Sequence, residues 1–218
     1  MQKELKKRLF TSILILPIAA FFITKGSIPF LFFLIIILLL SLFEWFKLVG
    51  NRSIKYVGSI LLFFSFYFTY FLRINFGFDI FLFSLIVCIS TDLGGYIFGK
   101  SLKGPKLTKI SPNKTYAGML GGLLLSGILG SILVKSNYFS TPFGLNIFLN
   151  DNLRLVIIIL LISLVSQSGD LVFSYFKRLA KIKNTGNFLP GHGGILDRID
   201  GIIFAMPFSY FLFFYINQ

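Results

Sequence analysis

The sequence predicts an all-α, polytopic integral membrane protein with about seven transmembrane helices, within a range of six to nine. Two observations lead to this fold class. The chain of 218 residues is 56% hydrophobic and only 13% charged, whereas a soluble domain carries about 25% charged residues. The apolar residues also form long runs such as "SIPFLFFLIIILLLSLF" at 27–43, and uncharged runs of about this length are typical of membrane-spanning helices.

The first predicted span, 9–24, follows a basic start. We interpret it as a membrane helix rather than a cleaved signal peptide, because no small-residue cleavage site follows and another apolar run begins at once. Cys88, the single cysteine, lies in an apolar run and is expected to act as a small apolar filler. The other spans are predicted at 28–46, 56–72, 78–98, 117–134, 153–176 and 199–216.

The distribution of Lys and Arg predicts the orientation, because positive residues collect in cytoplasmic loops. With a cytoplasmic N-terminus, all but four of the 21 basic residues fall inside; the exceptions are Lys25, Arg73, Lys135 and Arg154. The formal net charge of +13 is then concentrated on one face of the membrane. Such charge beside a bilayer favours anionic lipid headgroups and nucleotide phosphates as partners over nucleic acid.

We expect one domain, 1–218, in which 1–89 provides N-terminal spans and 90–205 bears the motifs. Four of the eight acidic residues lie within or at the cytoplasmic ends of predicted spans: Asp92, Asp170, Asp197 and Asp200. An unpaired acid at such a depth costs several kcal/mol, so these four are candidate functional residues. The other acids, including Glu44, are interpreted as solvated side chains near span ends or in loops.

The segment "SQSGDLVFSYFKR" at 166–178 predicts a polar stripe on one helix face. Gln167, Asp170, Ser174 and Lys177 are spaced i, i+3, i+7 and i+10, which places them on the same side of a helix. The stripe descends from the cytoplasmic end of the span towards the membrane interior. An alternative is an internal pair of Asp170 with a lysine that only holds helices together.

The segment "PGHGGILDRIDG" at 190–201 predicts a broken backbone followed by a helix start. Backbone N–H groups in such a loop, including those of Gly193 and Gly194, suit an anion. Asp197 and Asp200 would then lie on one face of the last helix and converge with Asp170, which makes an oxygen site of the kind that Mg²⁺ prefers. The alternative is a capped helix start with surface pairing of Asp197 and Arg198.

A third polar segment covers 90–122. Asp92 and Tyr96 share a helix stripe, and Ser111, Lys114 and Thr115 of "ISPNKT" could hold phosphate oxygens, although the segment lacks the glycines of a P-loop. The pairs Gly95–Gly99 and Gly118–Gly122 have GxxxG spacing. We interpret these glycines as sites of close helix packing.

These segments resemble the motifs of the phosphatidate cytidylyltransferase (CDP-diacylglycerol synthase) family over about residues 90–205. The long C-terminal signature is matched by Ser174, Lys177, Arg178, Lys183, Pro190, Gly191, His192, Gly193, Gly194, Asp197, Arg198 and Asp200. The middle elements are matched by Asp92, Tyr96, Gly99, Ser111, Pro112, Lys114, Thr115, Gln167, Gly169 and Asp170. Two positions depart from the pattern, because Asn184 replaces an Asp and Ala117 replaces a Glu.

The resemblance implies a nucleotidyltransferase that converts CTP and phosphatidate to CDP-diacylglycerol and pyrophosphate at the cytoplasmic face of a bacterial inner membrane. It implies Mg²⁺, as one or two cations, on Asp170 and Asp197, with Asp200 as a third ligand. The implied catalytic residues are Asp170, Lys177, Arg178, His192, Asp197 and Arg198. The implied substrate-binding residues are Asp92, Tyr96, Ser111, Lys114, Thr115, Gln167, Ser174, Lys183, Gly193 and Gly194.

Three other functions stay open at this point, as does a homodimer. A related CTP-dependent enzyme acting on another lipid phosphate or a polyprenol would carry similar phosphate-binding residues. An inactive lipid-binding homologue would fit the departures at Asn184 and Ala117. A transporter is disfavoured because the polar residues gather at the cytoplasmic end of the spans.

Overall fold

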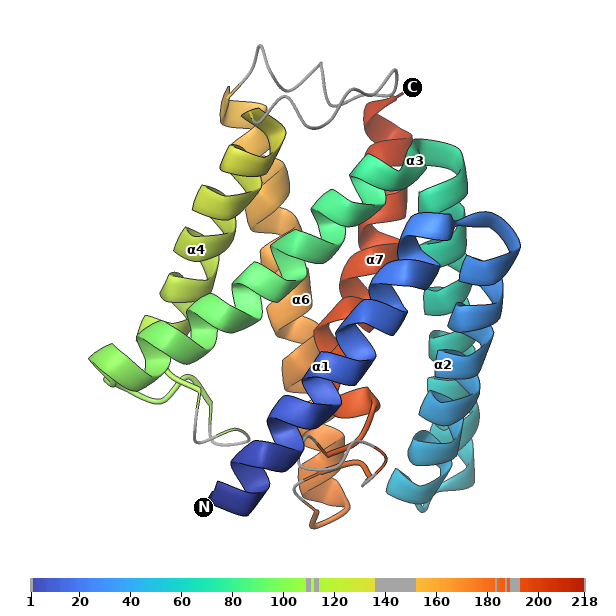
Figure 1. Ribbon diagram of the computed structural model, residues 1–218. Coiled ribbons are helices and arrows are strands. Elements are labelled where there is room, and N and C mark those ends of the chain that lie inside the picture. The colour runs from blue at the N-terminus through green and yellow to red at the C-terminus, as the bar shows by residue number, and fades with distance from the viewer. Residues whose placement is uncertain are drawn as a thin grey trace. The chain divides into compact units, whose positions relative to one another are not determined.

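The structure is a computed structural model that describes residues 2–108, 111, 114–135, 152–182, 184–186, 188 and 193–217, with the backbone alone for 2–10 and 12. In these residues the ordered elements are helices, apart from isolated bridge residues such as the pair Lys106 and Thr115. The all-α prediction is therefore confirmed (Figure 1). The helices are α1 (Gln2–Lys25), α2 (Ser27–Leu48), α3 (Arg52–Leu102), α4 (Tyr116–Lys135), α6 (Asn152–Leu179) and α7 (Leu196–Ile216).

Length and composition make this chain an integral membrane protein. In the described residues, five helices are long and apolar enough to cross a membrane, namely α2, α3, α4, α6 and α7, and α1 contains the shorter apolar segment Ile13–Lys25. Helix α3 has 51 residues in two helical parts, which at 1.5 Å per residue measure about 76 Å in total along the chain, more than twice the thickness of a bilayer core. Gly77, with φ 86°, kinks α3 between the predicted spans 56–72 and 78–98.

The chain divides into two compact units, each built from two sequence segments. The first unit comprises Met1–Tyr70 and Phe176–Ile199, and the second comprises Phe71–Tyr175 and Asp200–Gln218. In the first unit, the buried indole of Trp45 donates a hydrogen bond to the Lys55 carbonyl (3.1 Å) and meets the Phe176 ring edge-on at 5.1 Å. Gly58 lies directly against this indole, so helices α2 and α3 approach closely there.

The second unit depends on glycines that let helix backbones touch. A Cβ atom placed on Gly94 of α3 would lie 2.4 Å from the carbonyl oxygen of Gly121 on α4. A Cβ atom on Gly118 would lie 2.8 Å from the Gly95 carbonyl oxygen and 3.3 Å from the Cα of Gly99. This contact joins the C-terminal half of α3 to the start of α4 (Figure 1). The prediction that the GxxxG glycines pack helices together is thus confirmed.

Helices α6 and α7 also meet in the second unit through small residues. Gly169 of α6 lies against the backbone oxygen of Asp200 on α7, and Gly201 lies against Ser166. Ser163 of α6 also shares a 2.7 Å hydrogen bond with Thr91 of α3. Close packing of these helices fixes the position of Asp170 on α6 relative to α3 and α7.

We predict that Gly94→Ala destabilises the protein. The new methyl group would clash with the backbone of Gly121 and Gly122 rather than with a flexible side chain, and such overpacking costs about 1–3 kcal/mol. The measurement is the midpoint of thermal unfolding in detergent. Gly127→Ala is the matched control, because nothing lies within 4 Å of a Cβ there. Equal midpoints for the two variants would contradict the packing argument.

Candidate active site

The first candidate pair joins Lys114 to Asp170 within the second unit. The Lys114 Nζ lies 2.5 Å from Asp170 Oδ2, and the two side chains are 25% and 29% exposed. Asp170 is carried by α6, whereas Lys114 lies just before α4. The two charged groups thus neutralise each other while both stay partly exposed.

A short two-stranded turn holds Lys114 in place. The Lys114 carbonyl accepts a hydrogen bond from the Leu107 N–H (2.8 Å), and its own N–H donates to the Ser111 carbonyl (3.0 Å). Thr115 caps α4, because its hydroxyl oxygen accepts a hydrogen bond from the Gly118 N–H at 3.1 Å. These hydrogen bonds of Ser111, Lys114 and Thr115 hold Lys114 beside the acid on α6.

Other residues of the second unit that the sequence singled out lie on the same helices. Gln167 of α6 donates to the Met119 carbonyl of α4 at 3.4 Å. Asp92 and Tyr96 are both exposed on α3, and the Tyr96 hydroxyl lies 3.4 Å from the Lys100 ammonium. The Asp200 side chain is buried, with its Oδ1 accepting a hydrogen bond from the Gly201 N–H (3.0 Å).

The second candidate pair joins Lys177 to Asp197 within the first unit. The Lys177 Nζ lies 2.8 Å from Asp197 Oδ1, and the side chains are only 12% and 10% exposed. Asp197 Oδ2 accepts two further hydrogen bonds, from the N–H groups of Thr185 (2.9 Å) and Gly194 (3.0 Å). The contact with Gly194, three residues earlier, is the carboxylate half of a capping box at the start of α7.

This geometry changes two expectations about the glycine-rich segment. The Gly194 N–H, expected to bind an anion, donates instead to Asp197. Asp197, for which a surface pair with Arg198 was the alternative, forms an ion pair with Lys177. Gly193 has φ 88°, a conformation that glycine adopts without strain. Of the remaining motif residues, Ser174 is buried and Arg178 and Arg198 are exposed, while Lys183 and His192 lie outside the described residues.

Glu44 is a structural centre of the first unit that the sequence interpretation missed. It was expected to be solvated, but its side chain is 1% exposed. Its Oε1 accepts a hydrogen bond from the Ile195 N–H, and its Oε2 accepts from the Leu196 N–H and the Thr185 hydroxyl, each at 2.9 Å. The solvated interpretation of Glu44 is therefore wrong. A signal was present, because Glu44 interrupts the apolar run "SLFEWF".

The carboxylate oxygens of the two pairs have the chemistry of ligands for a hard cation. Across the ranges that the structure describes, no three Asp, Glu, His or Cys side chains lie close enough to hold a metal ion. Asp170 keeps a partly exposed carboxylate, whereas Asp197 already accepts three hydrogen bonds.

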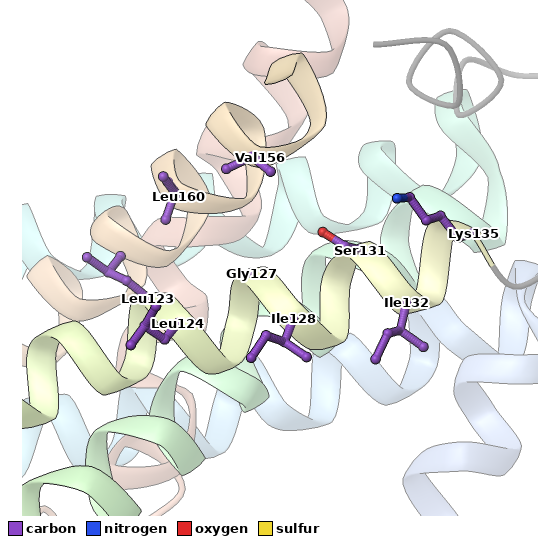
Figure 2. A pocket seen from close by; sticks show the side chains of 9 residues that line it. All are labelled: Leu123, Leu124, Gly127, Ile128, Ser131, Ile132, Lys135, Val156 and Leu160. Atoms are coloured by element: carbon purple, nitrogen blue, oxygen red, sulfur yellow. The ribbon is translucent and has the colours of Figure 1, made fainter. Parts of the chain in front are cut away.

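A groove of about 830 Å³ lies between α4 and α6 in the second unit. Figure 2 shows leucine, isoleucine and valine side chains of both helices around it, with Ser131 and Lys135 as its polar members. Lys135 ends α4, about 30 Å along the helix from its start at Tyr116. The groove lacks carboxylates, so it is not the candidate active site.

Comparison with known proteins identifies a family that fits these motifs. The profile of the cytidylyltransferase family matches residues 54–216. A phosphatidate cytidylyltransferase of Rickettsia bellii is 34% identical over 220 residues, which cover 97% of this chain and 91% of the relative. Phosphatidate cytidylyltransferases of Bacillus subtilis and Staphylococcus haemolyticus are 41% and 40% identical, over 66% and 71% of this chain.

The extent of these matches differs between relatives. The aligned part spans about half the length of the Bacillus and Staphylococcus proteins, at 52% and 54%, but nearly all of the Rickettsia protein. The matched region contains both lysine–aspartate pairs, while Glu44 precedes the part that the profile matches. The family profile covers most of this chain, and the Rickettsia relative aligns with nearly all of it, so the chain belongs to the cytidylyltransferase family.

Proposed function

We propose that this chain transfers the CMP moiety of CTP to phosphatidate, giving CDP-diacylglycerol and pyrophosphate. The observation that carries the proposal is the presence of two lysine–aspartate pairs at motif positions, Lys114–Asp170 and Lys177–Asp197. The names of the bacterial relatives support the same reaction. The substrates are one soluble nucleotide and one membrane lipid, and no nucleic acid takes part.

In this reaction an oxygen of the phosphatidate phosphate attacks the α-phosphorus of CTP. A P–O bond forms to the lipid phosphate, and the bond between the α-phosphorus and the β-phosphate bridge breaks to release pyrophosphate. Two anions must come together, so alignment and charge neutralisation dominate the catalysis. The lipid phosphate is already an anion near neutral pH, and a dedicated general base is therefore not required.

The two lysines supply positive charge for the phosphates, and each is already held in place by an aspartate. Lys114 and Lys177 are each held beside an aspartate, so each ammonium group can turn from its carboxylate to a phosphate oxygen without crossing the membrane interior. Arg178 and Arg198 are exposed and suited to bidentate phosphate contacts. We assign Lys183 and His192 the same task of phosphate binding, on the basis of the motif alone.

Carboxylate oxygens are suitable ligands for a divalent cation such as Mg²⁺. When bound, such a cation would neutralise phosphate charge and stabilise the leaving pyrophosphate. We propose Asp170 and Asp197 as its ligands, with Asp200 as a third. The contacts favour Asp170 as the stronger ligand, because Asp197 must give up the Lys177 contact before Oδ1 can bind a cation.

The remaining motif residues are proposed to line the nucleotide pocket. Ser111 and Thr115 flank Lys114 in its turn, and Gln167 lies one turn before Asp170 on α6. Asp92 and Tyr96 offer exposed polar groups on α3. The other proposed contacts come from Ser174, Gly193 and Gly194. We place this site on the cytoplasmic face, where CTP is available, with the N-terminus on the same side.

The first test is CTP- and Mg²⁺-dependent conversion of phosphatidate by the full chain purified in detergent. We expect Asp170→Asn to reduce kcat/KM by about 100-fold or more, because it removes a charge that acts on the reacting phosphates. Asp197→Asn should reduce turnover and also lower the unfolding midpoint, since that carboxylate holds the loop before α7. Asp79→Asn is the control, an acid on α3 outside both pairs. Absence of turnover in the wild type, or normal turnover in Asp170→Asn, would refute the assignment.

A second test addresses orientation through cysteine labelling of spheroplasts with a membrane-impermeant maleimide. Lys106 and Lys25 are both exposed and are predicted to lie on opposite faces. We expect Lys25→Cys to be labelled in intact spheroplasts and Lys106→Cys only after permeabilisation. The wild type should stay unlabelled, because Cys88 is fully buried. The reverse pattern would place the site on the outer face.

A further inference from the structure

The Glu44 carboxylate binds the loop that precedes α7, yet no step of the proposed reaction uses it. Glu44 comes from α2, before the region that the family profile matches. Its two oxygens accept three hydrogen bonds of 2.9 Å from Thr185, Ile195 and Leu196. Two of the donors are N–H groups at the start of α7, where a negative charge is favourable. Glu44 therefore caps a helix from another part of the fold.

The loop is held between two carboxylates that share Thr185. The Thr185 hydroxyl donates to Glu44, and the Thr185 N–H donates to Asp197. The neighbouring N–H groups divide in the same way, because Gly194 donates to Asp197 while Ile195 and Leu196 donate to Glu44. We call Glu44, Asp197 and these donors the loop clamp.

Two glycines of the loop fit closely around Glu44. A Cβ atom on Gly186 would lie 2.6 Å from Glu44 Oε1, and one on Gly194 would lie 2.5 Å from Oε2 and 2.0 Å from the Thr185 hydroxyl. At these three distances, a side chain at either glycine would displace Glu44 or Thr185. The backbone at Gly186 and Gly194 thus lies in close contact with the Glu44 carboxylate. A change at residue 44 is therefore expected to shift these loop residues.

Asp197 is the link from the loop clamp to the chemistry. One of its oxygens is held by the loop, and the other is held by Lys177. Because the loop atoms that Asp197 binds are adjacent to those that Glu44 binds, removal of the Glu44 contacts frees the loop side of Asp197. The Asp197 carboxylate and Lys177 would then lose their shared orientation.

We infer that Glu44 is a positioning residue of the active site, which sets the orientation of Asp197 and Lys177 through the loop clamp. The inference rests on the proposed function of these two residues. A positioning role predicts a fall in kcat with little change in the KM for CTP, because binding groups remain while their alignment is lost. A purely structural role predicts a lower unfolding midpoint with unchanged kcat well below that midpoint.

The main variant is Glu44→Gln in the full chain, assayed for CTP- and Mg²⁺-dependent turnover of phosphatidate in mixed micelles. Glutamine has nearly the same shape, but its amide NH₂ faces N–H and O–H donors that need an acceptor. We expect kcat to fall by about 10-fold or more, the usual effect of losing a supporting partner, with KM for CTP changed by less than about 3-fold. Glu44→Asp keeps both oxygens and should recover part of the lost kcat.

Two companion variants keep the test decisive if Glu44→Gln does not fold. Thr185→Val removes the hydroxyl that donates to Glu44 but keeps the N–H that donates to Asp197, and we expect a smaller fall in kcat at unchanged KM. Ser41→Ala is the control, because Ser41 is equally buried one turn earlier on α2 and bonds only within its helix. We expect wild-type kcat for Ser41→Ala.

The outcomes separate the two proposals. If folded Glu44→Gln or folded Thr185→Val had the same kcat as the wild type, the positioning role would be overturned. The proposed function would still stand in that case, because the unchanged protein turns over its substrates. A fall in kcat that Ser41→Ala also shows would overturn it as well. No turnover in the wild type would refute the proposed function instead, independently of residue 44.

Discussion

The Asp197 carboxylate is the contact on which the C-terminal polar segment depends. It binds the Lys177 ammonium of α6 with one oxygen and the N–H groups of Thr185 and Gly194 with the other. A charge at the edge of a membrane is stable only when it is paired and hydrogen-bonded. Here the Asp197 carboxylate pairs with the lysine and also accepts the hydrogen bonds of the loop and of the start of α7.

The same requirement explains why the loop needs a second acid. The first N–H groups of a helix have no acceptor within the helix itself, so those at the start of α7 need acceptors from elsewhere. Asp197 accepts the Gly194 N–H, and Glu44 accepts those of Ile195 and Leu196. Both carboxylates are largely removed from water, and the donors they receive compensate for the lost hydration.

In the second unit, the helix contacts determine which lysine lies beside Asp170. Gly94, Gly95 and Gly99 of α3 allow α4 to approach at backbone distance, and the Thr115 cap fixes where α4 begins. Lys114 then lies directly before a rigid helix and reaches Asp170. This pair remains more exposed than Lys177–Asp197, which fits a pair that exchanges partners with a phosphate.

Hydropathy and motif spacing in the sequence were enough to predict the helical membrane fold, the approximate spans, the glycine contacts between α3 and α4, and the family. These properties depend on residues close to one another along the chain, where periodicity and composition are informative. Pairings between distant positions were not predictable. The sequence left open which lysine could pair with Asp170, and the structure shows that it is Lys114.

Only the tertiary structure decided which acids are buried and what they bind. Glu44 lies 141 residues before Thr185 and 151 before Ile195, so no local pattern links them. Its acidic side chain near the end of an apolar helix was equally compatible with solvent. The sequence by itself determined that polar chemistry gathers beside the membrane, because charge is rare and costly there. Packing decided which carboxylate faces which donor, because hydrogen bonds depend on positions that only the folded chain brings within 3 Å.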